Sequence, residues 1–199
     1  MATAFTEKER EIILTRLKEA ARHFSSTIGM RKTTVDDLVA AADISKGAFY
    51  KFYESKELLF FKMMEDLHTE IYGRAEEVLH TQLQLSPGDR IACALLTALD
   101  MMAQNSMMDF FENELSYLLR KVPQEALDKH FHSDDHHILM LIESSGIALS
   151  QSPEVISAVV RALVLTVSHR KQIGEQYDTV LKLMVRSICH SLVASDQAN

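Results

Sequence analysis

Residues that interrupt helices are scarce in this sequence. Its 199 residues include only 6 glycines and 3 prolines, and the glycines do not cluster. Long stretches therefore run without the residues that most often end a helix, which favours helical structure throughout.

Cysteines and long apolar runs are also lacking. The only two cysteines, Cys93 and Cys189, are too few and too far apart for a disulfide framework or a zinc knuckle, so we expect two buried thiols in a reducing compartment. The longest mostly apolar stretch, residues 155–167, contains Arg161 and is too short to cross a bilayer. The charged N-terminus is not followed by the apolar core of a signal peptide. We therefore expect a soluble, cytoplasmic protein with no membrane partner.

The net charge of −7 argues at first against nucleic acid, but its distribution does not. Residues 1–60 carry 10 Lys and Arg against 9 Asp and Glu, a net charge of +1, so the remaining −8 belongs to residues 61–199. Lys46, Lys51 and Lys56 are spaced along one segment of the first part. This distribution permits DNA binding by the N-terminal part without requiring it.

The spacing of apolar residues predicts helices along the whole chain. A helix–turn–helix layout is expected early, because Thr34 and Ser45 can each cap a short helix after a first helix over residues 6–26. No segment has the sustained alternation of a strand. The expected helices cover residues 6–26, 34–43, 46–53, 56–81, 86–105, 106–121, 123–145, 152–173 and 175–194. The prediction is an all-α protein with a DNA-binding domain over 1–55 and a larger helical domain over 56–199.

The segment TTVDDLVAAADISKGAFYKFYESKELL, residues 33–59, closely resembles the N-terminal signature of the tetracycline-repressor (TetR) family. Ala20, Ala21, Phe24 and Gly29 fit the same signature upstream. The resemblance covers about residues 10–60. It implies a dimeric transcriptional regulator, in most members a repressor, whose helical second domain binds a small-molecule effector. It also implies a palindromic double-stranded DNA operator, because a two-fold dimer reads two equivalent half-sites.

The residue types of this segment suit a recognition helix. Gly47 and Ala48 keep its leading turn slim enough to enter a DNA groove, and Tyr50 and Lys51 supply hydrogen-bond donors. By resemblance, Lys56 matches a lysine that contacts a phosphate. The residues expected at the DNA are Thr33, Thr34, Ser45, Lys46, Gly47, Ala48, Tyr50, Lys51, Phe52 and Lys56.

Asp43 departs from the family pattern, which usually has glycine at this turn. Aspartate adopts positive φ more readily than most residues but less readily than glycine. We therefore expect the turn to form with Asp43 in the left-handed region. The order Phe52-Tyr53 also reverses the commoner one, which bears on base preference and not on the fold.

Histidines over residues 130–137 are the best metal candidates in the sequence. On a helix, His132 and His136 share one face, and His130, Asp134 and His137 share another. A solvated helix accounts for the same pattern, and we assign neither a metal nor a cofactor. No catalytic motif is present, so we expect no enzyme. The competing interpretation is an enzyme or a helical adaptor that does not bind DNA.

The second domain predicts both a dimer and an effector pocket. The last two long helices are expected to form a four-helix bundle with those of a second copy, because the helix over 152–173 is apolar on two sides. The middle helices are rich in methionine and aromatic residues, which suit an adaptable apolar pocket for an apolar or cationic effector. The candidate pocket residues are Met64, Met101, Met102, Met107, Phe110, Phe111, Tyr117 and Met140.

Overall fold

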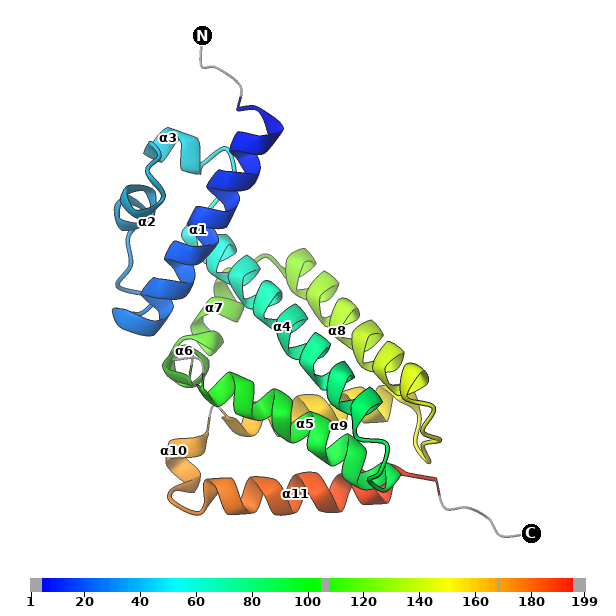
Figure 1. The fold of residues 1–199 in the computed structure, drawn as a ribbon. Helices are drawn as coiled ribbons and strands as arrows, with labels where there is room; N and C mark the ends of the chain where they lie inside the picture. Colours follow the sequence, from blue (N-terminus) through cyan, green and yellow to red (C-terminus); the bar gives the residue numbers. More distant parts are fainter. Residues whose placement is uncertain (1–4, 105–107, 168, 195–199) are drawn as a thin grey trace, which may run out of the picture. The chain divides into compact units, whose positions relative to one another are not determined.

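The computed structural model describes residues 5–104, 108–167 and 169–194 (Figure 1). Over these ranges the chain is helical without a strand, apart from an isolated bridge between Leu149 and Val193, which confirms the all-α prediction. The helices are α1 (Glu7–Thr27), α2 (Val35–Ala42), α3 (Lys46–Phe49), α4 (Lys56–Thr81), α5 (Pro87–Gln104), α6 (Met108–Asn113), α7 (Leu115–Lys121), α8 (Gln124–Ser145), α9 (Pro153–Val167), α10 (Arg170–Ile173) and α11 (Tyr177–Leu192).

The helices form two compact units whose limits differ from the predicted domains. The N-terminal unit ends at Leu67 and also includes Asp109–Pro123, the segment of α6 and α7. The C-terminal unit comprises His68–Met108 and the residues from Gln124 onwards. The helix α4 therefore contributes its first part to one unit and its second part to the other, so the predicted boundary at residue 55 does not separate the two units.

In the N-terminal unit, α1, α2 and α3 form at the places where the sequence supplies caps. The side chains of Thr6 and Glu9 form a reciprocal capping box at the start of α1, and those of Thr34 and Asp37 do the same for α2. Ser45 caps α3, which ends at Phe49 and is shorter than the predicted helix over 46–53. The fully buried side chains at the centre of this unit include Leu17, Leu38, Phe49, Leu59 and Phe60.

Asp43 ends α2 in the left-handed conformation, with φ 55° and ψ 51°. It is the one residue other than glycine with positive φ in the described part of the chain, which confirms the expectation for this turn. Its amide nitrogen donates to the carbonyls of Ala40 and Val39, so the last turn of α2 is closed as a glycine would close it.

The C-terminal unit is built around α5 and α11, which run side by side (Figure 1). The helix α9 packs against both α8 and α11. The chain around Leu149 is tied to the end of α11, because Ser150 N–H donates to the Leu192 carbonyl at 2.8 Å and Ala194 N–H donates to that of Ala148 at 2.9 Å. None of the helices in the described ranges has the length and apolar character needed to span a membrane.

Two of the predicted helices are interrupted. The helix expected over 106–121 is divided at Glu114 into α6 and α7, and the one expected over 152–173 is divided into α9 and α10. Glu114 has φ −120° and ψ −26°, outside regular helical geometry, and its carboxylate is buried. Apolar spacing carried no sign of this break, because the reason for it lies in a distant part of the chain.

Candidate DNA-binding surface and ligand cavity

The most accessible residues of the predicted DNA surface lie on and around α3. Lys46, Gly47, Tyr50 and Lys51 are exposed, and 52% of the surface of Tyr50 is accessible. A Cβ atom added at Gly47 would meet no atom within 4 Å, so nothing in the protein covers this turn. Lysine and tyrosine donors beside an uncovered helical turn have the chemistry needed to contact phosphates and base edges.

The two exposed lysines on and beside α3, Lys46 and Lys51, contact other side chains of the protein. The Lys46 ammonium lies 3.0 Å from the Asp36 carboxylate, and the Lys51 ammonium lies 5.4 Å from the centre of the Phe5 ring. Exposed contacts of this kind are individually weak. Both lysines can therefore exchange these partners for a DNA phosphate at little cost.

Four other residues of the predicted set have structural roles within the protein. Ala48 is buried, and Thr33 is fully buried with its hydroxyl donating to the Gly29 carbonyl at 2.8 Å. Ser45 accepts from the Ala48 amide at 3.2 Å, which caps α3. The half-buried Phe52 ring lies 5.7 Å from the ring of Phe5. Any contact of these side chains with DNA stays a prediction.

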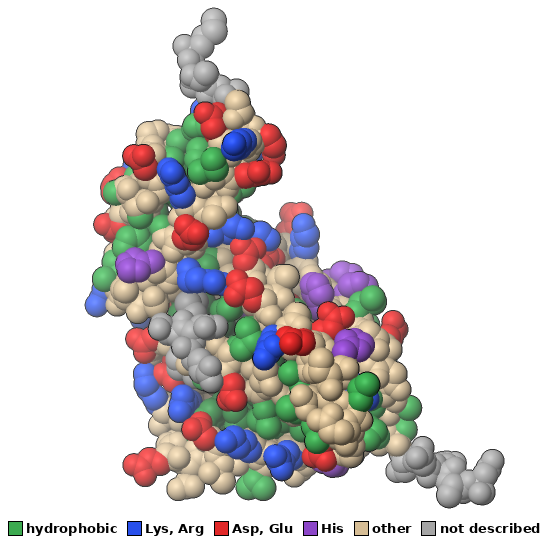
Figure 2. Space-filling model, viewed as in Figure 1, with side chains coloured by type: hydrophobic (Ala, Val, Ile, Leu, Met, Phe, Trp, Pro, Cys, Tyr) green, Lys and Arg blue, Asp and Glu red, His purple; other side chains and the backbone are tan. Residues whose placement is uncertain are grey.

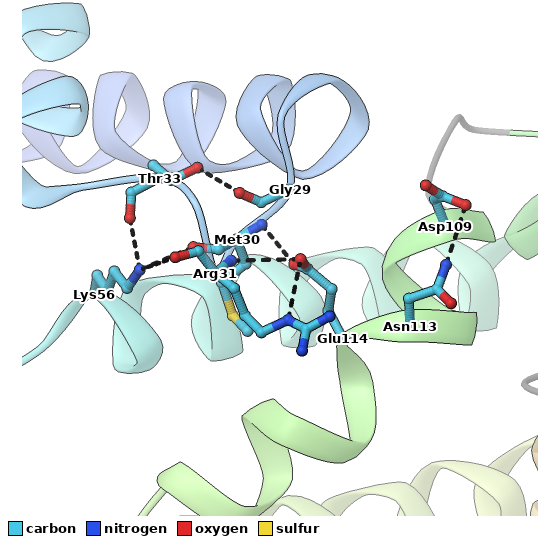
Figure 3. A network of polar contacts seen from close by, with 8 residues as sticks. All are labelled: Gly29, Met30, Arg31, Thr33, Lys56, Asp109, Asn113 and Glu114. Carbon is cyan, nitrogen blue, oxygen red and sulfur yellow. Dashed lines mark hydrogen bonds and ion pairs between the residues drawn. The ribbon is translucent and has the colours of Figure 1, made fainter.

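Lys56 organises the turn between α1 and α2 (Figure 3). Its ammonium donates to the carbonyls of Thr33 at 2.6 Å, Met30 at 2.9 Å and Arg31 at 3.2 Å. An ammonium group has three donors, and all three are directed at this turn. The sequence analysis did not anticipate this role, and the expected phosphate contact of Lys56 stays untested.

Glu114 holds the same turn from its other side (Figure 3). Its carboxylate accepts from the amides of Met30 at 2.5 Å and Arg31 at 3.4 Å, and it lies 3.8 Å from the Arg31 guanidinium. Gly29 has φ +85°, and a Cβ there would lie 2.7 Å from Glu114 Oε1. Glycine is thus required both by the backbone conformation and by the close carboxylate.

A cavity of about 190 Å³ lies within the C-terminal unit. Its wall is almost entirely aliphatic and is supplied by α4, α5, α8, α9 and α11. Characteristic lining residues are Ile71, Leu95, Ile142, Val160 and Ile188. For comparison, an apolar cavity of about 150 Å³ suffices to bind benzene. The site can therefore enclose a small apolar molecule or an apolar part of a larger one.

The predicted pocket residues and this cavity share one residue, Met102. Met64, Phe110, Phe111 and Tyr117 belong to the N-terminal unit, where the first three are buried. On α8, 50% of the Met140 surface is exposed. Met101 is half-buried and does not line the cavity, and Met107 lies outside the described residues. The ligand-binding role of the eight predicted residues stays a prediction, and the cavity was not anticipated from methionine and aromatic content.

One end of the cavity is polar. His68 and Tyr72 from α4, Asp134 from α8 and Arg161 from α9 all contribute to its lining. Burial raises the pKa of Tyr72, and the neighbouring Asp134 carboxylate raises it further, so its hydroxyl keeps its proton and donates to Asp134. Burial alone would raise the pKa of Asp134, but His68, His130 and Tyr72 outweigh burial and lower it. Asp134 is therefore a carboxylate at neutral pH.

The other candidate histidines of α8 lie on its outer surface. Histidine side chains gather over this helix in Figure 2, and His132, His136 and His137 are exposed. The ring of His137 stacks on Tyr72 with the ring centres 5.1 Å apart. The sequence placed His130, Asp134 and His137 on one face of the helix as a possible metal site. In the structure, the third group near His130 and Asp134 is His68 of α4 and not His137.

Comparisons with known proteins agree with this architecture. Residues 17–63 match the family described as bacterial regulatory proteins, tetR family. An uncharacterised HTH-type transcriptional regulator, YhgD of Bacillus subtilis (strain 168), is 25% identical over 150 residues, which cover 74% of this chain and 78% of the relative.

Solved structures share the fold across almost the whole chain. A TetR-family transcriptional regulator from Pectobacterium atrosepticum superposes with a TM-score of 0.71 at 18% identity, covering 96% of this chain and 99% of the other. The regulator FadR from Bacillus subtilis, in complex with stearoyl-CoA, superposes with a TM-score of 0.59 at 17% identity, covering 90% of this chain and 97% of the other.

The three hydrogen bonds of Lys56 predict a large effect of its removal on stability. Lys56→Met leaves three carbonyls of the turn without their donor, and we expect a loss of about 1–3 kcal/mol in the free energy of unfolding. The matched control is Lys62→Met on the same helix, because Lys62 is exposed and forms surface ion pairs with Glu65 and Asp66, an arrangement worth about 0–1 kcal/mol. Urea denaturation followed by circular dichroism measures both, and equal midpoints would contradict the structural role of Lys56.

Proposed function

We propose that the chain is a transcriptional regulator of the TetR family and that it represses transcription as a homodimer bound to a palindromic operator. A small apolar molecule in the cavity of the C-terminal unit releases it from DNA. The observation that carries the proposal is the exposed, donor-bearing turn of α3 on a domain of this family.

Operator recognition is assigned to α3 and the residues that follow it. Lys46 and Gly47 open the helix, and Tyr50 and Lys51 come directly after its last turn. A recognition helix places its N-terminal residues against base edges, while neighbouring donors hold phosphates. A two-fold dimer presents two such helices about one DNA turn apart, which requires a palindromic site.

Dimer formation is supported by apolar side chains that the protein leaves exposed on α9 and α11. The exposed fraction is 44% for Val155, 53% for Leu165, 63% for Leu183 and 38% for Met184. The opposite sides of these helices supply buried residues, among them Leu163 and Val185. A helix that is apolar on two sides needs a second partner, and a second copy in a four-helix bundle meets this need.

Apolar spacing places Tyr177, Val180, Leu181, Met184, Val185, Ile188 and Leu192 in one stripe of α11, and this stripe divides between the two sides of the helix. Tyr177, Leu181, Val185 and Leu192 are buried, whereas Val180 and Met184 are exposed together with Leu183. On α9, Val155 and Ala162 are exposed while Val159 lines the cavity. We therefore assign the dimer contact to the exposed subset and not to the whole stripe.

Effector release is assigned to the cavity because its composition suits a ligand. Its wall is mostly aliphatic with few polar groups, the arrangement by which pockets combine affinity with orientation. FadR of the same fold is known in complex with stearoyl-CoA, a molecule with an apolar chain and a charged head. We propose an effector with an apolar body and a polar group placed near His68 and Tyr72.

The assignment of α3 to operator recognition predicts that Lys51→Ala loses affinity for the operator. We expect binding to the selected operator to weaken by about 1–3 kcal/mol, because Lys51 loses a contact to a base or phosphate. Lys62→Ala removes an equally charged exposed lysine from α4 and should bind as the unchanged protein does. Electrophoretic shifts on sequences selected from random DNA measure both. A selection without a palindrome would refute dimeric operator binding.

The dimer assignment predicts monomers when charge enters the exposed apolar face. Leu165→Glu and Leu183→Glu each place a carboxylate where the partner helix packs, so sedimentation velocity at micromolar concentration should show a shift from dimer to monomer. Leu83→Glu is the matched control, because Leu83 is 67% exposed and lies outside α9 and α11. A stable monomer of the unchanged protein would end this assignment.

The effector assignment predicts that filling the cavity separates DNA binding from release. Ala98 lines the cavity, and Ala98→Phe should occupy its volume while leaving α3 unchanged. This variant should bind operator normally but require at least about tenfold more effector for release.

The unchanged protein provides a second test by calorimetry. Operator DNA should weaken effector binding by the same factor by which effector weakens operator binding. Equal effector affinities with and without operator would disprove the coupling.

A further inference from the structure

Three groups with metal-binding atoms converge at the polar end of the cavity. His68 comes from α4, and His130 and Asp134 come from α8, one helical turn apart. The ligand atoms of all three residues lie within 4.8 Å of one another. Residues four apart on one helix present side chains on the same face, so α8 offers two ligands and α4 supplies the third.

Each histidine lies as close to one oxygen of Asp134 as two ligands of a small cation lie to each other. His68 Nδ1 lies 3.5 Å from Asp134 Oδ1, and His130 Nε2 lies 3.3 Å from Asp134 Oδ2. Donors bound tetrahedrally to one zinc ion at about 2.0–2.1 Å lie about 3.3–3.4 Å from one another. Because the two histidines face different oxygens of Asp134 and all ligand atoms lie within 4.8 Å, rotations of the side chains can direct the three groups at a common point.

Burial makes this cluster unlike a group of surface histidines. His130 is buried, and the Asp134 side chain is 18% exposed. His68 Nδ1 is inaccessible to solvent and has no hydrogen-bond partner among the described residues, and 3.5 Å is longer than an ordinary N–H···O bond. A buried polar atom without a partner is costly, and a bound cation would satisfy it.

We propose that His68, His130 and Asp134 bind one divalent transition-metal ion of the zinc type. Two imidazoles and one carboxylate form a ligand set that zinc accepts, and imidazole nitrogen favours zinc over magnesium or calcium. The Tyr72 hydroxyl donates to Asp134 and so orients the carboxylate, as outer-shell groups do in metal sites. This proposal goes beyond operator binding and release, and neither depends on it.

The fourth coordination position faces the cavity. His68 and Asp134 line the cavity, whereas His130 does not, so the open side of the cluster is toward the enclosed space. The nearby Arg161 guanidinium is paired with Asp135 at 2.6 Å, which offsets its repulsion of a cation. A carboxylate or phenolate group on a cavity occupant would complete the coordination of the ion.

Zinc and cobalt titrations of the full chain, without an affinity tag, test this site in the absence of DNA and effector. We expect one ion per chain in competition with a zinc-binding dye, and a visible absorption spectrum of four-coordinate cobalt after Co²⁺ addition. His68→Gln and His130→Gln should each weaken binding more than about 100-fold, because even outer-shell partners contribute about 10–100-fold. The exposed His132→Gln and His136→Gln on the same helix are matched controls and should bind as the unchanged protein does.

The alternatives give different results. Absence of zinc binding would overturn the proposal. Zinc binding that is lost in the controls but retained in His68→Gln would also overturn it, because the ion would then lie on the outer face of α8. Circular dichroism and operator binding show whether each variant is folded. If His130→Gln does not fold, X-ray absorption of the zinc-loaded unchanged protein decides: two imidazoles with carboxylate oxygen support the site, and three or more imidazoles refute it. Failure of operator binding alone would leave this result intact and would count only against the proposed function.

Discussion

The N-terminal unit depends on the way one turn is held between opposite charges. The Lys56 ammonium donates hydrogen bonds to the carbonyls of Met30 and Arg31 in the turn between α1 and α2. The Glu114 carboxylate accepts hydrogen bonds from the amides of the same two residues. Charges of opposite sign lie at the two ends of the peptide group between Met30 and Arg31, which strengthens the hydrogen bonds at both ends. The turn leads directly into Thr34, the cap of α2, so this clamp sets where the helix-turn-helix begins.

Features fixed by a few neighbouring residues could be predicted from the sequence. The capping pairs Thr6 with Glu9 and Thr34 with Asp37 formed as expected, because each depends on residues three apart. The left-handed turn at Asp43 was also predictable, since glycine is usual at this position in the family and aspartate adopts positive φ more readily than most residues. The family resemblance of residues 33–59 rests on the same local constraints, and the matched family and the fold confirm it.

Features that depend on distant partners could not be predicted in this way. Glu114 looked like an ordinary helical residue, yet its partners are amides far earlier in the chain. His68 stands alone in its own segment and acquires meaning only beside His130 and Asp134. The cavity wall consists mainly of leucine, isoleucine and valine, whose pattern is the same whether they fill a core or surround a ligand. Periodicity identifies the inner face of a helix but not what that face encloses.

The path of the chain connects the cavity with the clamp. The segment Asp109–Pro123, which carries Glu114, is joined at one end to α5 and at the other to α8. Both helices line the cavity, α5 through Met102 and α8 through Asp134. In the proposed release, an occupant that favours a different position of either helix would act through the segment whose carboxylate holds the turn before α2. The free energy available for this displacement is limited to the difference in the occupant's affinity for the two states. An occupant that also coordinates an ion at Asp134 would act on α8, whose first residue directly follows the segment that carries Glu114.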